Sequence, residues 1–246
     1  MNKYLEPVSG DRVKRGNTRR DPDDSNKSRE FYRHYWWMYD PVYFRGETLI
    51  SFGTNAGWIL RKIVKIPSTA VPKSKRNRLK LIEESSLVPN STKQLARKFY
   101  EQYHCLANFM PLPRMSKADS KYNLNLVKGS KTFWDYPDLF LPELHNYFLH
   151  RSGKLTEAME HPRNRDWLFG FGTWPEFVEA NYLQTFYKTG SDYTSLEQLR
   201  PARDGSLDER IDYFFTTALN LIERRANLLA NSQPISKPSI LIVERH

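Results

Sequence analysis

Cysteine and long apolar runs are scarce in this sequence. Cys105 is the only cysteine among 246 residues, which excludes an intrachain disulfide and a zinc site built from cysteines alone. No stretch approaches the ~18 consecutive apolar residues that a bilayer-spanning helix requires. The basic N-terminal residues are not followed by the apolar segment of a secretory signal. From these absences we expect a cytoplasmic protein with no membrane partner.

The signatures of several common enzyme classes are also missing. The sequence contains no P-loop, no glycine-rich dinucleotide-binding fingerprint, no G-x-S-x-G nucleophile elbow, no H-E-x-x-H zinc motif and no pair of C-x-x-C motifs. These absences disfavour the usual nucleotide-binding, hydrolase and zinc-binding classes. They leave open an enzyme of another kind.

Positive charge is the strongest signal that the composition does carry. Lys and Arg number 38 and Asp and Glu 28, so the net charge is +10 with neutral histidines. Such an excess favours an acidic partner, and nucleic acid is the first candidate. The alternative is that the charges only solvate the surface. The basic residues that we expect to contact nucleic acid are Arg15, Arg19 and Arg20 near the N-terminus, Lys73, Lys75, Arg76 and Arg78 in the densest basic run, and Lys128, Arg163 and Arg165 further along.

The hydropathy pattern predicts a mainly α protein, a single-domain, helical bundle-like globule with a long irregular loop region and minor strand content. The sequence includes 14 Phe, 14 Tyr and 6 Trp residues, which supply enough apolar surface for a sizeable core. We expect a flexible basic N-terminal arm over residues 1–27, a helical globular domain over residues 28–232, and a tail or short docking strand over residues 233–246.

Four stretches carry clear helix signals. Aromatic residues between positions 31 and 39 lie on one helical face, and Asp40-Pro41 is expected to end that helix. Pro137 suits the first turn of a helix reaching to about residue 148. Two capping boxes, at residues 173–176 and 206–209, open further helices, the second extending to about residue 231. In this last helix, Arg225 is predicted to lie off the apolar stripe.

The intervening segments are less regular. Residues 67–78 are expected to form a basic loop, and residues 79–88 a short helix. Residues 107–133 contain Pro111, Pro113 and several Asn and Ser residues, which predict irregular structure with at most one short strand. Function is often located on loops of this length.

The most distinctive segment begins at His104 and has the sequence H-C-L-A-N-F-M-P-L-P. Asn123-Leu124-Asn125 and Lys128-Gly129 follow it. This order resembles an uncharacterised family of bacterial and phage proteins that share an N-F-M-P-L-P core. It is also distantly similar to the C-terminal half of the HNH-like nuclease domain of type IV restriction enzymes. In that comparison, Ile222-Glu223-Arg224-Arg225 corresponds to the last helix.

The HNH-like resemblance implies a metal-dependent phosphodiesterase, with Mg²⁺ as its metal. The catalytic residues would be His104 as general base, with Asn108 and Asn125 orienting it. The sequence departs from the nuclease pattern upstream of His104, because His34 follows no carboxylate that could complete an acid–histidine pair. The resemblance therefore implies a nucleic-acid-interacting protein that is either a divergent nuclease or a degenerate, non-cutting one.

Other interpretations stay open. Asn108 could instead tie two backbone segments together, because its amide offers two donors and an acceptor. The aromatic residues between positions 167 and 174 could stack on bases or anchor a turn in the core. The main functional alternative is a non-enzymatic helical protein that binds a protein partner, and a small-molecule enzyme is a third.

Overall fold

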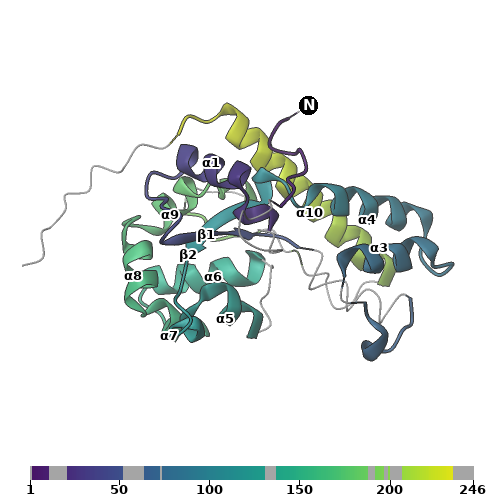
Figure 1. Cartoon of the computed structure of the whole chain (residues 1–246), viewed down its shortest axis with the longest axis horizontal. Coiled ribbons are helices and arrows are strands. Elements are labelled where there is room, and N and C mark those ends of the chain that lie inside the picture. Colours follow the sequence, from purple (N-terminus) through teal and green to yellow (C-terminus); the bar gives the residue numbers. More distant parts are fainter. Residues whose placement is uncertain are drawn as a thin grey trace, which may run out of the picture.

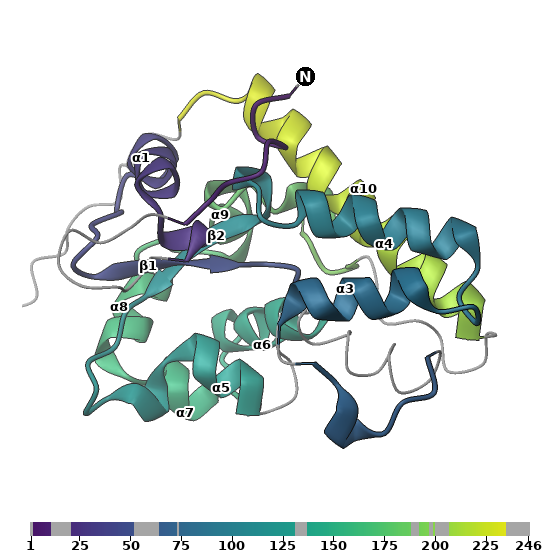
Figure 2. The ribbon, with the colours of Figure 1, turned by 45° about the vertical axis from the view of Figure 1, so that its right-hand side comes forward.

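A short two-stranded antiparallel sheet lies at the centre of the fold, with helices on both sides of it (Figure 1, Figure 2). Strand β1 (Phe44–Thr48) pairs with β2 (Phe109–Pro113), and Gly46 lies opposite Pro111. Proline has no N–H to donate, but a two-stranded sheet consists of edge strands, where proline is tolerated.

The computed structural model describes residues 2–10, 21–51, 64–72, 74–130, 137–187, 192–196, 199 and 207–234. Within these residues helices predominate, and β1 and β2 form the only sheet. The predicted mainly α fold is confirmed. None of the helices described here is long and apolar enough to cross a membrane.

Helix α1 (Asn26–Tyr35) lies on one side of the sheet and follows the 3-10 turn η1 (Pro22–Asp24). Ser25 caps α1, because its hydroxyl oxygen accepts a hydrogen bond from the Ser28 backbone N–H. The helix ends at Tyr35, earlier than Asp40-Pro41 predicts. Trp36 takes an extended conformation there, and its indole N–H donates to Asn181 Oδ1 at 2.9 Å. A tertiary contact therefore ends this helix before the proline does.

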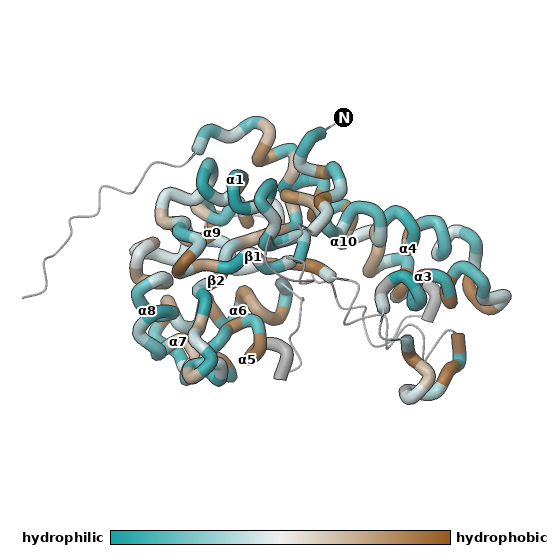
Figure 3. The backbone as a smooth tube through the Cα atoms, viewed as in Figure 1, coloured by the Kyte–Doolittle hydropathy of each residue, from teal (hydrophilic) through white to brown (hydrophobic). Residues whose placement is uncertain are grey.

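Helices α3 (Lys75–Glu84) and α4 (Asn90–Gln102) extend away from the sheet and pack with the first part of α10 (Leu207–Asn231), whose later turns lie back over the centre of the fold (Figure 1). The apolar residues of α4 recur at intervals along a largely hydrophilic helix (Figure 3), and the Phe99 ring meets Phe214 and Phe215 of α10. The predicted end of α10 is confirmed. The predicted basic loop is wrong at residues 75–78, which form the first turn of α3 behind the Ser74 cap; Lys and Arg are good helix formers.

The other side of the sheet is covered by α5 (Leu124–Ser130), α6 (Pro137–Phe148), α7 (Thr156–Met159) and α8 (Pro162–Phe169) (Figure 2). Helix α9 (Trp174–Ala180) lies towards α1, and its capping box is formed as predicted. The remaining 3-10 turns are η2 (Ser68–Ala70), η3 (Leu106–Asn108), η4 (Ser120–Tyr122) and η5 (Gln184–Phe186).

The aromatic residues of the helices on the two sides of the sheet are mostly core residues. Trp36, Trp167, Phe171 and Trp174 are all buried, which favours core packing over a stacking surface at these positions. Phe169 at the end of α8 and Tyr213 of α10 are instead exposed.

The N-terminal residues pack against the segment that follows α4. The Val8 N–H donates to the His104 carbonyl at 2.7 Å, and the Ala107 N–H donates to the Tyr4 carbonyl at 3.1 Å. Tyr4 and Val8 are buried. Residues 21–27 form η1 and the start of α1. Tyr4 and Val8 thus hold residues 2–10 against the fold, and residues 11–20 of the predicted flexible arm lie outside the described residues.

Candidate nucleic-acid interface

Asn108 ends η3 immediately before β2 and is completely buried. Its Nδ2 donates to the carbonyl oxygens of Ile50 at 2.6 Å and Tyr103 at 2.8 Å. Its Oδ1 accepts from the Ile50 backbone N–H at 3.0 Å. The amide thus joins Ile50, after β1, to Tyr103, at the end of α4. This geometry corresponds to the structural interpretation of Asn108.

Arg225 of α10 is completely buried, so its predicted place off the apolar stripe is wrong. Its guanidinium donates to four main-chain carbonyls, those of Ala107 (2.7 Å), Phe109 (2.9 Å), Asn181 (2.9 Å) and Tyr182 (3.1 Å). These acceptors are carbonyl oxygens rather than carboxylates. Burial lowers the pKa of Arg225 to about 10, so the side chain is a cation at neutral pH.

The Arg225 contacts connect the two segments on which the HNH-like resemblance depends. The carbonyls on either side of Asn108 accept from Arg225, the last residue of the Ile222–Arg225 segment. The fold therefore brings these segments into direct contact, through a residue to which the resemblance assigns no catalytic role.

The three residues predicted to be catalytic lie on three different elements. His104 is half-buried between α4 and η3, with its ring centre 3.9 Å from that of Tyr103. Asn108 ends η3 and directs its amide to the backbone. Asn125 is half-buried in the first turn of α5, where its backbone N–H donates to Asn123 Oδ1 at 3.0 Å. The contacts described here give Asn108 no position from which to orient His104.

The basic residues predicted to bind nucleic acid have varied surroundings. Arg78 donates to the Pro72 carbonyl at 2.6 Å, Arg76 is exposed on α3, and Arg165 pairs with Asp166 at 3.3 Å. Outside the described residues or side chains lie Arg15, Arg19, Arg20, Lys73, Lys75 and Lys128.

Arg163, in the first turn of α8, lies where separate chain segments meet. It donates from Nη1 to the Arg114 carbonyl just beyond β2, and its guanidinium lies 5.3 Å from the Tyr43 ring centre. The next residue, Asn164, donates from Nδ2 to the Tyr122 carbonyl of η4 at 2.9 Å. We call this group the Arg163 cluster, which comprises Tyr43, Arg114, Asp119, Lys121, Tyr122, His161, Arg163 and Asn164.

The Arg163 cluster combines cations with aromatic rings at the surface. Tyr43 is 52% exposed, and Arg114 and Lys121 are exposed as well. The Lys121 Nζ lies 4.6 Å from the Tyr122 ring centre. Hydrogen bonding to Tyr122 raises the pKa of Lys121 above its ordinary value, so Lys121 is a cation at neutral pH. Asp119 contributes a carboxylate that partly offsets these charges.

His161 adds a titratable group to the cluster. Its ring centre is 4.9 Å from that of Tyr122, and its Nε2 is 3.9 Å from Asp119 Oδ1. This distance is too long for a hydrogen bond but within reach of an ion pair. Its Nδ1 is buried without a hydrogen-bond partner among the described groups. A histidine beside a carboxylate is an arrangement that general acids and bases use. Sequence alone does not predict this pair, because Asp119 and His161 are far apart in the chain.

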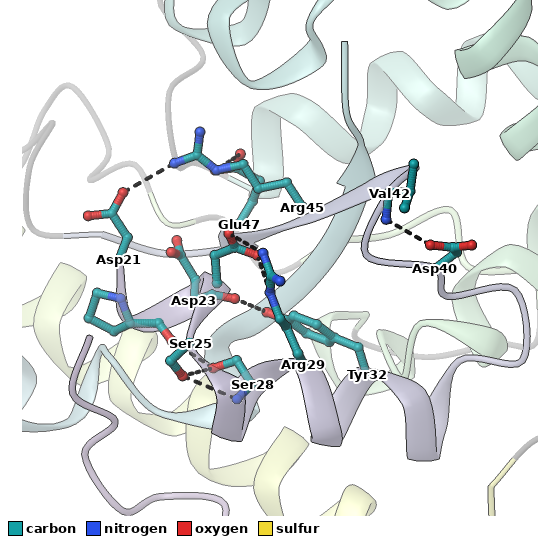
Figure 4. A network of polar contacts seen from close by, with 12 residues as sticks. Asp21, Asp23, Ser25, Ser28, Arg29, Tyr32, Asp40, Val42, Arg45 and Glu47 are labelled. Atoms are coloured by element: carbon teal, nitrogen blue, oxygen red, sulfur yellow. Dashed lines mark hydrogen bonds and ion pairs between the residues drawn. The ribbon is translucent and has the colours of Figure 1, made fainter. Parts of the chain in front are cut away.

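A separate polar network surrounds Asp23, where η1 meets β1 (Figure 4). Its Oδ2 accepts from the Thr48 hydroxyl at 3.0 Å, whereas its Oδ1 is buried without a partner in the described part of the chain. Burial raises the pKa of Asp23 to about 6; nearby Asp21 adds to the rise, and the Thr48 hydrogen bond opposes it. A Cβ on Gly46 would lie only 1.7 Å from the Asp23 carbonyl oxygen. Glycine is thus required where β1 passes the backbone of Asp23.

The described residues offer no metal site. No group of three or more His, Cys, Asp or Glu side chains within them is arranged to hold a metal ion. The Mg²⁺ that the HNH-like resemblance implies therefore has no ligand set in this part of the chain.

Comparison with known proteins adds no family or fold relationship. No family model, curated protein or solved structure matches the chain. The interpretation of the Arg163 cluster therefore depends on its geometry and chemistry.

The Arg163 cluster was only partly visible in the sequence. Arg163 and Arg165 stand out in the segment H-P-R-N-R, whose density of donors suits phosphate. Tyr43 and Arg114 carry no local signal, because only the pairing of β1 with β2 brings them beside α8.

Proposed function

We propose that this protein binds nucleic acid through the Arg163 cluster. The observation that carries the proposal is the contact of Arg163 with the exposed Tyr43 ring, with the exposed residues Arg114 and Lys121 on adjoining segments. Guanidinium groups donate to phosphates in a fixed fork geometry, and exposed aromatic rings stack on bases. The net charge of +10 would draw a polyanion towards the protein before these contacts form.

Other basic residues support this proposal less directly. Arg76 on α3 is exposed and suits a phosphate contact, whereas Arg78 already donates to the Pro72 carbonyl. On the same helical pair, Lys80 and Arg97 face Glu84 and Glu83 at 3.5 and 2.8 Å. Their cations are partly neutralised, so we expect α3 and α4 to contribute attraction rather than a specific contact.

Binding to labelled nucleic acid tests the proposal. Fluorescence anisotropy would be measured with RNA, single-stranded DNA and duplex DNA between about 50 and 200 mM salt, where phosphate contacts weaken steeply. We expect the double variant Arg163→Gln/Lys121→Gln to bind about tenfold more weakly, with a salt slope reduced by about two phosphate contacts.

The matched control is Lys80→Gln/Arg97→Gln, which removes the same charge from α3 and α4, far from α8 (Figure 1). We expect this variant to lose about threefold or less, because only long-range attraction changes. Equal losses in both double variants would show that charge alone attracts the ligand. Absence of binding by the unaltered protein at the lower salt concentration would reject the proposal and favour a protein partner.

Phosphodiester cleavage is a second candidate function, favoured by the proximity of His161 to Asp119. The HNH-like resemblance assigns the general base to His104 instead. Incubation of the protein with RNA and DNA, with and without Mg²⁺, followed by a denaturing gel, tests cleavage directly. Loss of product in His161→Ala would place the base in the Arg163 cluster, and loss in His104→Ala would support the resemblance. Binding by the unaltered protein without any product would reject the cleavage hypothesis.

A further inference from the structure

The Tyr43 ring is exposed, yet its backbone is firmly held. The Val42 N–H donates to Asp40 Oδ1 at 2.7 Å (Figure 4), and the Tyr43 N–H donates to the Asp40 carbonyl at 3.0 Å. On the other side, the Tyr43 carbonyl accepts from the Arg114 N–H at 2.8 Å. A turn and a strand pairing thus fix the backbone on both sides of the ring. A ring on such a backbone loses little conformational freedom when a flat ligand stacks on it.

Arg163 lies beside this ring with donors to spare. Its Nη1 donates to the Arg114 carbonyl, which orients the guanidinium, while Nε and Nη2 have no hydrogen-bond partner in the described part of the chain. A phosphate oxygen can accept from these remaining N–H groups. When a base stacks on Tyr43, the Arg163 guanidinium is therefore close enough to donate to the neighbouring phosphate.

The next residue of α8, Asn164, contacts the backbone of a second tyrosine, Tyr122 of η4. Asn164 holds the Tyr122 carbonyl at 2.9 Å, and the Tyr122 ring is flanked by Lys121 and His161. Consecutive residues of α8 thus reach two tyrosine-bearing segments, each accompanied by a cation. This alternation of ring and charge suits the repeating base and phosphate of a flexible strand.

The same surface is poorly suited to a double helix. Bases in a duplex are stacked on each other, so they cannot lie on Tyr43 unless the duplex opens. The cluster is built from a turn, a strand end, a 3-10 turn and the first turn of α8.

We infer that the Arg163 cluster takes single-stranded nucleic acid, with an unpaired base on the Tyr43 ring and an adjoining phosphate on the Arg163 guanidinium. The inference rests on the proposed function, because it specifies which nucleic acid that site binds. RNA and single-stranded DNA share this chemistry, and separate probes distinguish them.

Anisotropy with matched oligonucleotides tests the inference. The probes are a strand of about 12 nucleotides as RNA, the same strand as DNA, and its DNA duplex, a length within the usual range for single-strand-binding sites. We expect the protein to bind at least one single strand about tenfold more tightly than the duplex, since stacking on one ring alone has an effect of this size.

Tyr43 variants separate stacking from charge. Tyr43→Leu retains apolar bulk without an aromatic face and should bind the preferred single strand about tenfold more weakly, whereas Tyr43→Phe should bind it normally. Tyr213→Leu removes an exposed tyrosine from α10 and should have no effect. A 2-aminopurine base in the strand should change its fluorescence on binding to the unaltered protein and to Tyr43→Phe, but much less with Tyr43→Leu.

The outcomes distinguish this inference from the function on which it rests. Equal or tighter binding of the duplex, or normal binding by Tyr43→Leu, would overturn the single-strand inference while leaving nucleic-acid binding intact. No binding of any probe would overturn both.

Discussion

Two arginines of this protein show how the same side chain can serve the fold or a ligand. Arg225 and Arg163 both donate to main-chain carbonyls, and both lie beside an aromatic ring, Trp36 at 6.0 Å and Tyr43 at 5.3 Å. Arg225 is fully enclosed and donates to four carbonyls. Arg163 lies at the surface and donates to one of the carbonyls described. The hydrogen-bonding capacity of Arg225 is thus used by the fold, whereas that of Arg163 remains available to a ligand.

Replacing Arg225 should produce the largest change in stability. Arg225→Leu would leave four buried carbonyls without their donor, and buried groups deprived of a charged partner destabilise a fold by about 4 kcal/mol. Arg225→Lys keeps the charge but cannot reproduce the fork, so we expect a smaller loss of about 2 kcal/mol. Urea denaturation followed by tryptophan fluorescence measures both free energies of unfolding.

The neighbouring arginine supplies the control for this experiment. Arg224 is exposed on the same turn of α10, and Arg224→Ala should change the free energy of unfolding by about 1 kcal/mol or less. If Arg225→Leu were as stable as Arg224→Ala, the buried contacts would contribute nothing, and the contrast with Arg163 would not hold.

The burial of Arg225 shows where local sequence analysis fails. The residue lies three positions after Ile222 and four after Leu221, so helical spacing alone places it on the buried face. Its charge argued against burial, since the four carbonyls that accept hydrogen bonds from it belong to residues 107, 109, 181 and 182, which are distant in the sequence. Helix periodicity and capping are local properties and were predictable. The acceptors of a buried cation are a property of the tertiary fold and were not.

Asp23 is an intermediate case between the two arginines, because it is buried but only partly hydrogen-bonded. Its pKa of about 6 lies above the ordinary value of 3.8, so the native state holds the proton more tightly than the unfolded state. Stability should therefore fall as the pH rises from about 4 through 6 and stay lower above that range. Asp23→Asn cannot ionise, and we expect it to be more stable than the unaltered protein by about 2 kcal/mol at pH 8.

The informative quantity for Asp23 is the difference between the two proteins across pH. Thermal or urea unfolding from pH 4 to pH 8 would be recorded for both, since other groups titrate equally in each. The advantage of Asp23→Asn should grow as the pH rises from about 4 to about 6 and stay constant above that range. Parallel curves over this range would show that the Asp23 carboxylate is as well solvated in the fold as in the unfolded chain.

The Arg163 cluster shows the same division between local and tertiary information. The donor-rich segment around Arg163 was selected from the sequence, as was the possibility that Asn108 is structural. The choice of His104 as a catalytic base followed the resemblance, whereas His161 is the histidine found beside a carboxylate and surface cations. Tyr43 could not be predicted as a site residue from the sequence, because its contact with Arg163 depends on the register of β1 with β2 and on the packing of α8.

Arg163→Gln should produce the smallest change in stability, although it removes a contact of the proposed interface. The variant loses one surface hydrogen bond to Arg114 and a cation beside an exposed ring, so we expect a change of about 0.5 kcal/mol or less in the free energy of unfolding. Urea denaturation and anisotropy on the same preparation measure the two effects together. The contrast with Arg225 requires a loss of affinity without a loss of stability. A destabilisation of about 2 kcal/mol or more would instead indicate that Arg163 holds β2 against α8 as part of the fold, since surface substitutions rarely have effects of that size.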